Sequence, residues 1–289
     1  MDVPTQREWA ERTVRAVNRA FPFPDATDYR NWQRCQQYLP HAQTCMKLID
    51  QWTFASPQGE RLSIVAGNYL KNHARYVEAE DYCKRAIAIS MQMYGPEHPN
   101  VATTLNNLGA LYLEQGKYAD AEPLLQRAIA IGEKTLGLEH PKVAMWFANL
   151  GALYLKQDKY AEAEPLLQQA IAVGEKSLGP EYPELAMWLN NLAELYSHQG
   201  KNEQAEVFLQ RAIAIGEKTL GSEHPTVAKR LNNLANLYRE QGKYEQAEQL
   251  YRQAVAIGEK MLGSENPLTL SFQHNLQALL MQRNQQIGL

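Results

Sequence analysis

The chain has 289 residues, of which 45% are hydrophobic and 21% are charged, a composition typical of a folded globular protein. Its formal net charge is only −3 and it has no block of lysine and arginine, so nucleic acid and anionic membrane surfaces are not favoured as partners. The apolar runs are too short to span a membrane, and the amino-terminal residues lack the apolar core of a signal peptide, which predicts a soluble cytoplasmic protein.

Residues 1–56 are predicted to form an amino-terminal helical cap. They contain two amphipathic helical segments, REWAERTVRAVNRAFP and WQRCQQYLPHAQTCMKLIDQW, separated by a proline-containing turn. The three cysteines of the chain, Cys35, Cys45 and Cys83, have neither the spacing of a metal site nor that of a disulfide framework. We therefore expect them to be buried, reduced thiols.

From residue 57 onward the sequence repeats with a period of 42 residues. The repeat is marked by two columns of residues, Gly95, Gly137, Gly179, Gly221 and Gly263, and Pro99, Pro141, Pro183, Pro225 and Pro267. Glycine is favoured where a helix ends and proline at the first position of the next helix, and a polar turn such as QGKYADA divides each period again. The pattern predicts five helix pairs and one terminal helix, at 57–98, 99–140, 141–182, 183–224, 225–266 and 267–289.

Apolar residues follow one face of both helices in each predicted pair. Leu105, Leu108 and Tyr112 form such a stripe on the first helix of one pair, with the spacing of an α-helix. A single pair buries too little apolar surface to be stable alone, so neighbouring pairs must stack. The sequence therefore predicts an all-α solenoid at residues 57–289.

The positions that carry this pattern match a known repeat family. They are Leu108, Gly109, Tyr112, Ala121, Leu125 and Ala128, and they resemble the tetratricopeptide repeat. The period of 42 residues exceeds the usual value of about 34 and is similar to the long-helix variant of kinesin light chains. The resemblance implies a right-handed α-solenoid whose concave groove is lined by the first helix of each pair.

Residues 1–56 carry a second, looser resemblance. The residues concerned are Trp9, Ala16, Val17, Asn18, Phe21, Pro22, Trp32, Cys35, Leu39, Pro40, His41 and Ala42. They resemble the segment before the repeats of bacterial NB-ARC-type signalling ATPases of the STAND class, which implies a sensor arm. Because the chain has no GxxxxGK[ST] phosphate-binding loop, the nucleotide chemistry would belong to a separate NTPase partner.

Asparagines recur on the side of the first helices opposite Leu108, which is the predicted groove face. One column reads Asn107, Asn149, Asn191, Asn233 and Asn275, and the neighbouring column contributes Asn106, Asn190 and Asn232. A primary amide can donate and accept hydrogen bonds, so the columns could bind the main chain of an extended peptide. The alternative is structural: each amide could bond to the backbone of the adjacent repeat.

Side chains that differ between repeats would determine which peptide binds. Met145 and Met187 predict an adaptable apolar floor in the central repeats. Cationic groups are contributed by Lys156, Lys229 and Arg239. We therefore expect an extended ligand with an apolar middle and an acidic end, whereas Trp146 and Trp188 are expected in the core between repeats.

No catalytic or metal-binding motif is present in the sequence. His98, His140 and His224 occupy the same loop of different repeats, at least about 10 Å apart, too far to share a zinc ion. We expect them to bond to the loop backbone. The sequence predicts a protein-binding scaffold or sensor arm without enzymatic activity or cofactor, and the alternatives are a self-associating structural module or a cargo adaptor like kinesin light chain.

Overall fold

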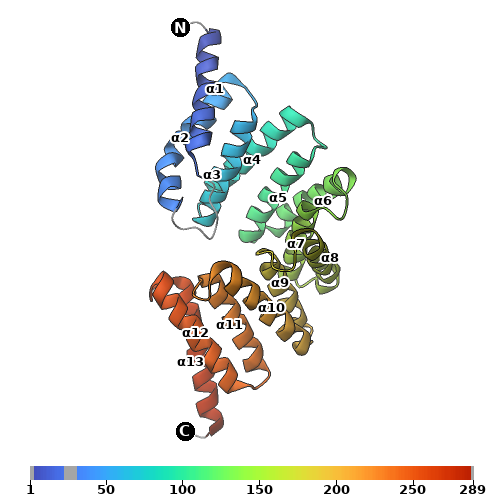
Figure 1. Ribbon diagram of the computed structural model, residues 1–289, viewed down its shortest axis with the longest axis vertical. Coiled ribbons are helices and arrows are strands. Elements are labelled where there is room, and N and C mark those ends of the chain that lie inside the picture. The colour runs from blue at the N-terminus through green and yellow to red at the C-terminus, as the bar shows by residue number, and fades with distance from the viewer. Residues whose placement is uncertain (1–2, 23–30, 288–289) are drawn as a thin grey trace. The chain divides into compact units, whose positions relative to one another are not determined.

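The computed structural model describes residues 3–22 and 31–287, which form thirteen α-helices and no strands (Figure 1). The helices are α1 (Val3–Ala20), α2 (Trp32–Trp52), α3 (Pro57–Asn72), α4 (Tyr76–Tyr94), α5 (Pro99–Glu114), α6 (Tyr118–Thr135), α7 (Pro141–Lys156), α8 (Tyr160–Leu178), α9 (Leu185–His198), α10 (Asn202–Leu220), α11 (Pro225–Glu240), α12 (Tyr244–Leu262) and α13 (Pro267–Ile287). This arrangement confirms the all-α solenoid of helix pairs. Among the described residues, no helix is both long and apolar enough to cross a membrane.

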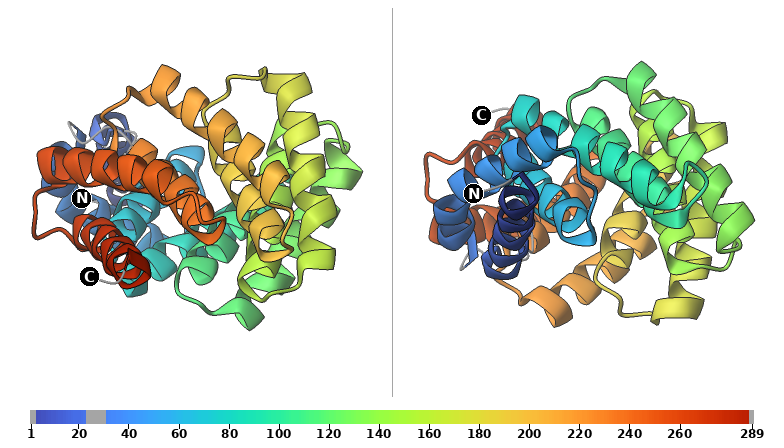
Figure 2. Two further views of the ribbon diagram at one scale, coloured as in Figure 1. Left: turned by 90° about the horizontal axis from the view of Figure 1, so that it is seen from below. Right: turned by 90° about the horizontal axis from the view of Figure 1, so that it is seen from above.

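The chain forms two compact units, Met1–Leu153 and Tyr154–Leu289. Unit 1 holds α1 to α6 and most of α7, and unit 2 holds the last residues of α7 and α8 to α13. Within each unit, helices that are neighbours in sequence pack side by side (Figure 2), as α3 and α4 do in unit 1 and α11 and α12 in unit 2. The second helix of a pair also packs on the first helix of the next, as α4 does on α5 and α10 on α11. Within each unit, these neighbouring pairs therefore pack against each other.

Histidine caps the first helix of several pairs. The Nδ1 atoms of His98, His140 and His224 each accept a hydrogen bond at 3.1 Å from the backbone amide two residues further on. Asn266 does the same with Oδ1 at 2.9 Å, before α13. The expected bond to the backbone is present, but the donating amide lies in the first turn of the helix and not in the loop. The histidine thus satisfies an amide that the first helical turn leaves without a partner.

Helix α9 begins later than its repeat predicts. Tyr182 occupies the position that the capping histidine has in other repeats, and its ring has no acceptor comparable to the histidine Nδ1. The helix begins at Leu185, two residues after Pro183, and no side chain caps it. The five glycines before these loops have φ between +83° and +94°, a backbone conformation that other residues rarely adopt.

The amino-terminal helices pack as a further, degenerate pair. Helices α1 and α2 pack on each other and both contact α3, which repeats the arrangement of α3, α4 and α5. Four buried residues of α2 have buried counterparts 44 residues later in α4: Cys35, Leu39, Ala42 and Met46 correspond to Ala79, Cys83, Ala86 and Ser90. Helices α1 and α2 thus pack against α3 with the packing scheme of the helix pairs, although their sequence does not follow the 42-residue period.

The core between repeats contains the two predicted tryptophans. Trp146 and Trp188 are 0% and 1% exposed, which confirms their placement in the core. Each indole occupies space left by a glycine on the preceding helix, because a Cβ on Gly132 would lie 2.3 Å from Trp146 and one on Gly174 would lie 2.6 Å from Trp188. Gly132 and Gly174 therefore permit a close approach that alanine would prevent.

Candidate functional site

Amide side chains join neighbouring first helices within each unit. In unit 1, Asn149 Nδ2 donates to Asn106 Oδ1 at 2.8 Å. In unit 2, Asn233 donates to Asn190 at 2.9 Å and Asn275 donates to Asn232 at 3.0 Å. These bonds run from side chain to side chain, not to the backbone of the adjacent repeat. They link the first helix of one pair to the first helix of the following pair, which is the role of the structural alternative. The acceptor is a side-chain oxygen, however, and not the backbone oxygen that was expected.

Two asparagines predicted for the groove lie in the interior. Asn106 is 2% exposed and Asn232 is 6% exposed, so neither amide can reach a ligand, and their placement in the groove is wrong. A helical wheel describes each helix in isolation. In the structure, the first helix of the following pair covers the edge on which these asparagines lie. Asn190 is half-buried and accepts the bond from Asn233.

Two other asparagines keep their amides available. Asn107 in unit 1 and Asn191 in unit 2 are half-buried and have no hydrogen bond to any residue that the structure describes. For Asn107 the reason lies in the sequence, because Ile64 occupies the position of the accepting asparagine one repeat earlier. These two amides can therefore bind a ligand without breaking an internal bond.

The first helices of unit 2 present an exposed apolar side chain on α9 and two cationic side chains on α11. Met187 on α9 is 47% exposed, one helical turn before Asn191. Lys229 occupies the position of α11 that is equivalent to Met187, and it is exposed, whereas Arg239 is half-buried. Neither cation has an ion pair among the described residues. The bond from Asn233 to Asn190 holds α9 and α11 side by side. We call Met187, Asn191, Lys229 and Arg239 the unit 2 face.

The predicted contributions of Lys156 and Met145 are reduced by their surroundings. The Nζ atom of Lys156 lies 2.7 Å from Glu194 Oε1, so the carboxylate neutralises its charge. Met145 in unit 1 is half-buried, whereas Met187 is exposed. The free cations and the exposed thioether of the predicted set thus all belong to α9 and α11.

Carboxylates also tie the second helix of one pair to the first helix of the next. Glu80 on α4 accepts hydrogen bonds from Tyr112 Oη at 3.0 Å and from Lys117 Nζ at 3.4 Å. The same contact recurs in unit 2 around Glu206. These ties are not predicted by the apolar pattern of the sequence, although glutamate, tyrosine and lysine recur with the repeat at the three positions. Their function is structural, because they occupy one another's hydrogen-bonding groups.

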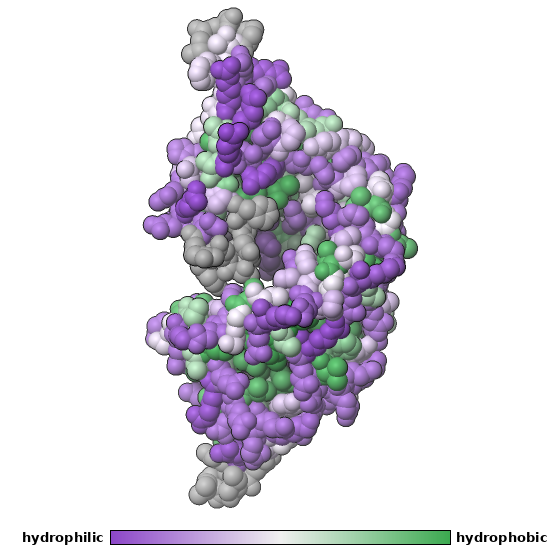
Figure 3. Space-filling model, viewed as in Figure 1, coloured by the Kyte–Doolittle hydropathy of each residue, from purple (hydrophilic) through white to green (hydrophobic). Residues whose placement is uncertain are grey.

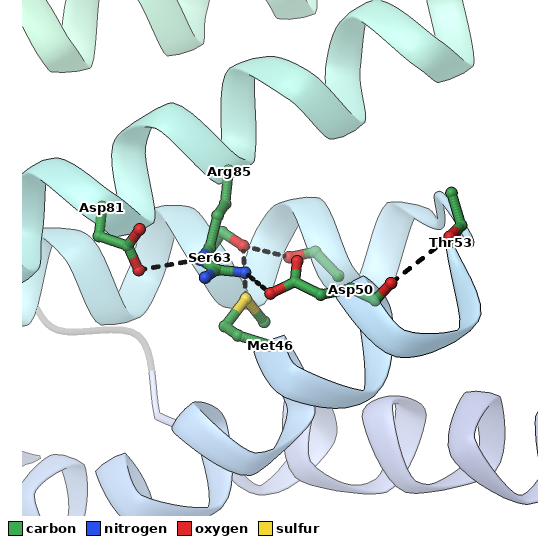
Figure 4. A network of polar contacts seen from close by, with 7 residues as sticks. Met46, Asp50, Thr53, Ser63, Asp81 and Arg85 are labelled. Atoms are coloured by element: carbon green, nitrogen blue, oxygen red, sulfur yellow. Dashed lines mark hydrogen bonds and ion pairs between the residues drawn. The ribbon is translucent and has the colours of Figure 1, made fainter.

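A cavity of about 290 Å³ opens between α2 and α4 in unit 1. Arg85 at its edge binds Asp81 at 2.8 Å and also binds Asp50 of α2, as Figure 4 shows. Met46 lies beside this network, and Ser63 Oγ donates to its sulfur at 3.2 Å. Because the two aspartates neutralise Arg85, the described lining of this cavity offers no unpaired cation. Within residues 3–22 and 31–287, no group of three or more metal-ligating side chains is close enough to hold an ion.

The family model for the tetratricopeptide repeat matches residues 66–134, 106–176, 142–218 and 184–260. Crystallised repeats of a putative kinesin light chain from Podosopora anserina are 30% identical, with a TM-score of 0.56 over 69% of this chain and 94% of that one. BtubC from P. vanneervenii (21% identity, TM-score 0.59, 89% and 94% covered) shares the fold. A Rap protein complexed with Competence and Sporulation Factor also shares the fold. It is 13% identical, with a TM-score of 0.62 over 95% of this chain and 88% of that one. No curated protein sequence matches the chain.

Proposed function

Because the chain belongs to the tetratricopeptide repeat family, we propose that it is a non-catalytic scaffold that binds an extended peptide of a partner protein on the unit 2 face. The observation that carries this proposal is the 47% exposure of Met187 next to an amide with no internal hydrogen bond. A flexible thioether adapts to different apolar side chains, so it suits a surface that receives one. The crystallised Rap protein is itself complexed with a factor, which fits such a role for the fold.

The chemistry of the face supports a ligand with separate apolar and acidic parts. An apolar side chain of the peptide would contact Met187, and the amide of Asn191 would bind its main chain. Lys229 and Arg239 would attract a carboxylate, since no acidic partner neutralises them among the described residues. In unit 1, Asn107 and Met145 offer a smaller set of contacts of the same kind.

Peptides selected from a random display library on the intact protein would test this proposal. We expect the bound peptides to combine an apolar residue with Asp or Glu, and Met187→Glu to weaken them by at least about tenfold, measured by fluorescence anisotropy. Val207→Glu is the matched control, because Val207 is an even more accessible apolar residue of unit 2 (60% exposed) on α10, a second helix. If Val207→Glu removed binding and Met187→Glu did not, the unit 2 face would not be the site.

The amino-terminal resemblance supports a more specific role for the scaffold. As the sensor arm of a STAND-type system, the chain would transmit peptide binding to a separate NTPase. A cargo adaptor is the alternative supported by the 30% identity to kinesin light chain repeats. Self-association is the other alternative, and light scattering over a concentration series distinguishes it, because a peptide-binding monomer keeps a mass of 32.8 kDa throughout.

A further inference from the structure

A second cavity, of about 300 Å³, lies between α1 and α3 in unit 1 and is lined by arginine and amide side chains. Its lining residues are Arg15, Asn18 and Arg19 from α1 and Gln58 and Arg61 from α3. Among the residues that the structure describes, three guanidinium groups border this cavity and none of the lining side chains is acidic. The arrangement has the opposite character to the cavity beside Arg85, where two carboxylates neutralise the cation.

The arginines of α1 differ in their partners along the helix. Arg7 and Arg12 each bind a glutamate one turn away, with N to O distances of 3.3 and 2.6 Å. Arg15 and Arg19 have no ion pair with any residue that the structure describes. They are one turn apart, so their like charges destabilise the helix unless an anion lies between them. The surface over α1 is strongly hydrophilic in the space-filling view (Figure 3).

Arg61 is held in position by the opposite wall of the cavity. Its Nη1 donates to the backbone oxygen of Asn18 at 2.9 Å and to Asn18 Oδ1 at 2.8 Å. No described residue accepts a hydrogen bond from Nε or Nη2 of Arg61, so these groups can donate to another acceptor. Because the guanidinium is planar and fixed at one edge, it is preorganised for an oxyanion, and its ordering costs less when a ligand binds.

The nearest carboxylate on α3 faces away from this cavity. Glu60 is adjacent in sequence to Arg61 but is 7% exposed, and it accepts hydrogen bonds from Ser90 and Tyr94 of α4. Gln58 lies in the first turn of α3, where the helix dipole adds positive potential. Among the described lining residues, both walls of the cavity therefore contribute positive charge.

We propose that this cavity binds a phosphate monoester. A tetrahedral dianion matches several guanidinium forks, which form paired, charge-assisted hydrogen bonds to phosphate oxygens. A volume of about 300 Å³ holds the phosphate and a small organic group. The phosphate is carried either by a small metabolite or by a phosphorylated side chain of a partner protein. The site lies in unit 1 and is independent of the unit 2 face.

Calorimetric titration of the intact protein at low ionic strength tests the proposal with four probes: inorganic phosphate, AMP, a phosphoserine hexapeptide and the same peptide unphosphorylated. We expect a dissociation constant of about 1 mM or lower for at least one phosphate probe and no binding of the unphosphorylated peptide. The double variant Arg15→Gln and Arg19→Gln should weaken the phosphate probe by at least about tenfold. Tighter binding of AMP would identify a metabolite, and tighter binding of the phosphopeptide would identify a protein partner.

The matched control is the double variant Arg7→Gln and Arg12→Gln, which removes the same charge from the same helix. All four arginines of α1 are exposed, so circular dichroism should show both variants to be folded. Unchanged binding in this control would support a specific site. An equal loss in both variants would show that only net charge matters and would overturn the proposal, as would the absence of phosphate binding to the unaltered chain.

Discussion

At the scale of single residues, Arg230 departs from the pattern that fills the core between repeats. It occupies the position of Trp146 and Trp188 in the preceding repeats and is 5% exposed. Its Nη1 has no hydrogen-bond partner among the described residues, and burial lowers the pKa of the guanidinium to about 10. The guanidinium occupies the space of an indole, since a Cβ on Gly216 would lie 2.3 Å from Nη1. An unpaired charge in this position destabilises unit 2.

We expect Arg230→Trp to stabilise the protein by about 1 to 3 kcal/mol, because it replaces an unpaired buried charge with a ring that two other repeats already accommodate. Urea unfolding followed by circular dichroism measures the change. The reverse substitution, Trp188→Arg, should destabilise the protein by a similar amount or more. A lower stability of Arg230→Trp would show that Arg230 has a partner in solution that compensates its charge.

At the scale of helices, glutamates tie one repeat to the next. The pKa of Glu80 is lowered, chiefly by its hydrogen bond with Lys84 and also by those with Tyr112 and Lys117. The pKa of Glu248 is lowered mainly by Arg252, with Arg283 of α13 contributing. Both carboxylates are mostly buried, at 21% and 17% side-chain exposure, so water screens these pairs only in part. Each tie therefore depends on an ionised glutamate.

These lowered pKa values predict a loss of stability in acid. The pKa of each of these carboxyl groups is lower in the folded state than in the unfolded state, where it is near 4.5. Such a group stabilises the fold at pH values above the unfolded-state pKa. This contribution is lost as the pH falls through the folded-state pKa. We expect the free energy of unfolding in urea to fall below about pH 4.5. The double variant Glu80→Gln and Glu248→Gln should be less stable at pH 7 and should show a smaller decrease in acid. An identical pH dependence would exclude these ties as its source.

Helix boundaries show which local features the sequence predicts well. The proline column locates the start of most first helices and the glycine column the end of the second helices, because proline lacks an amide hydrogen and glycine permits a positive φ. Helix α9 is the exception, since the effect of Tyr182 on the cap depends on a side-chain hydrogen bond that the 42-residue period does not describe. A repeat thus predicts a helix start only where its capping residue is kept.

At the scale of the whole molecule, the three cysteines all belong to unit 1 and lie in its core. Cys35 and Cys45 are 0% exposed and Cys83 is 6% exposed. Burial raises the pKa of Cys45 to about 11 and that of Cys83 to about 12, and it also raises the pKa of Cys35. The reactive thiolate is therefore both scarce and inaccessible, so the thiols report the opening of unit 1.

We expect the native thiols to react with 5,5′-dithiobis(2-nitrobenzoic acid) at pH 8 about a hundredfold or more slowly than in guanidinium chloride, where all three should react. Absorbance at the wavelength of the released thiolate gives the rate and the number of thiols. Because unit 2 has no cysteine, substitutions there serve as controls for chemical reactivity. One rapidly reacting thiol in the native protein would contradict the packing of α2 or α4.

The candidate site was only partly predictable. The asparagine columns follow from the repeat, but the wheel could not distinguish the buried Asn106 from the available Asn107. That distinction depends on which residue the neighbouring helix presents. Lys156 illustrates the same limit, since its charge is neutralised by Glu194 from a different helix. The arginine cavity was also missed, because Arg61 is 42 or more residues away from the arginines of α1.

The sequence by itself determined the helix pairs, their period and their apolar faces, because these depend on local backbone preferences and on a spacing that recurs within one chain. Only the tertiary structure decided which polar groups are left available. Asn149 and Asn191 are equivalent in the repeat, yet Asn149 donates to a neighbouring amide whereas Asn191 has no such bond to a residue that the structure describes. The physical reason is that hydrogen bonds and ion pairs form between helices, so the partners of a side chain depend on the residues that packing brings beside it.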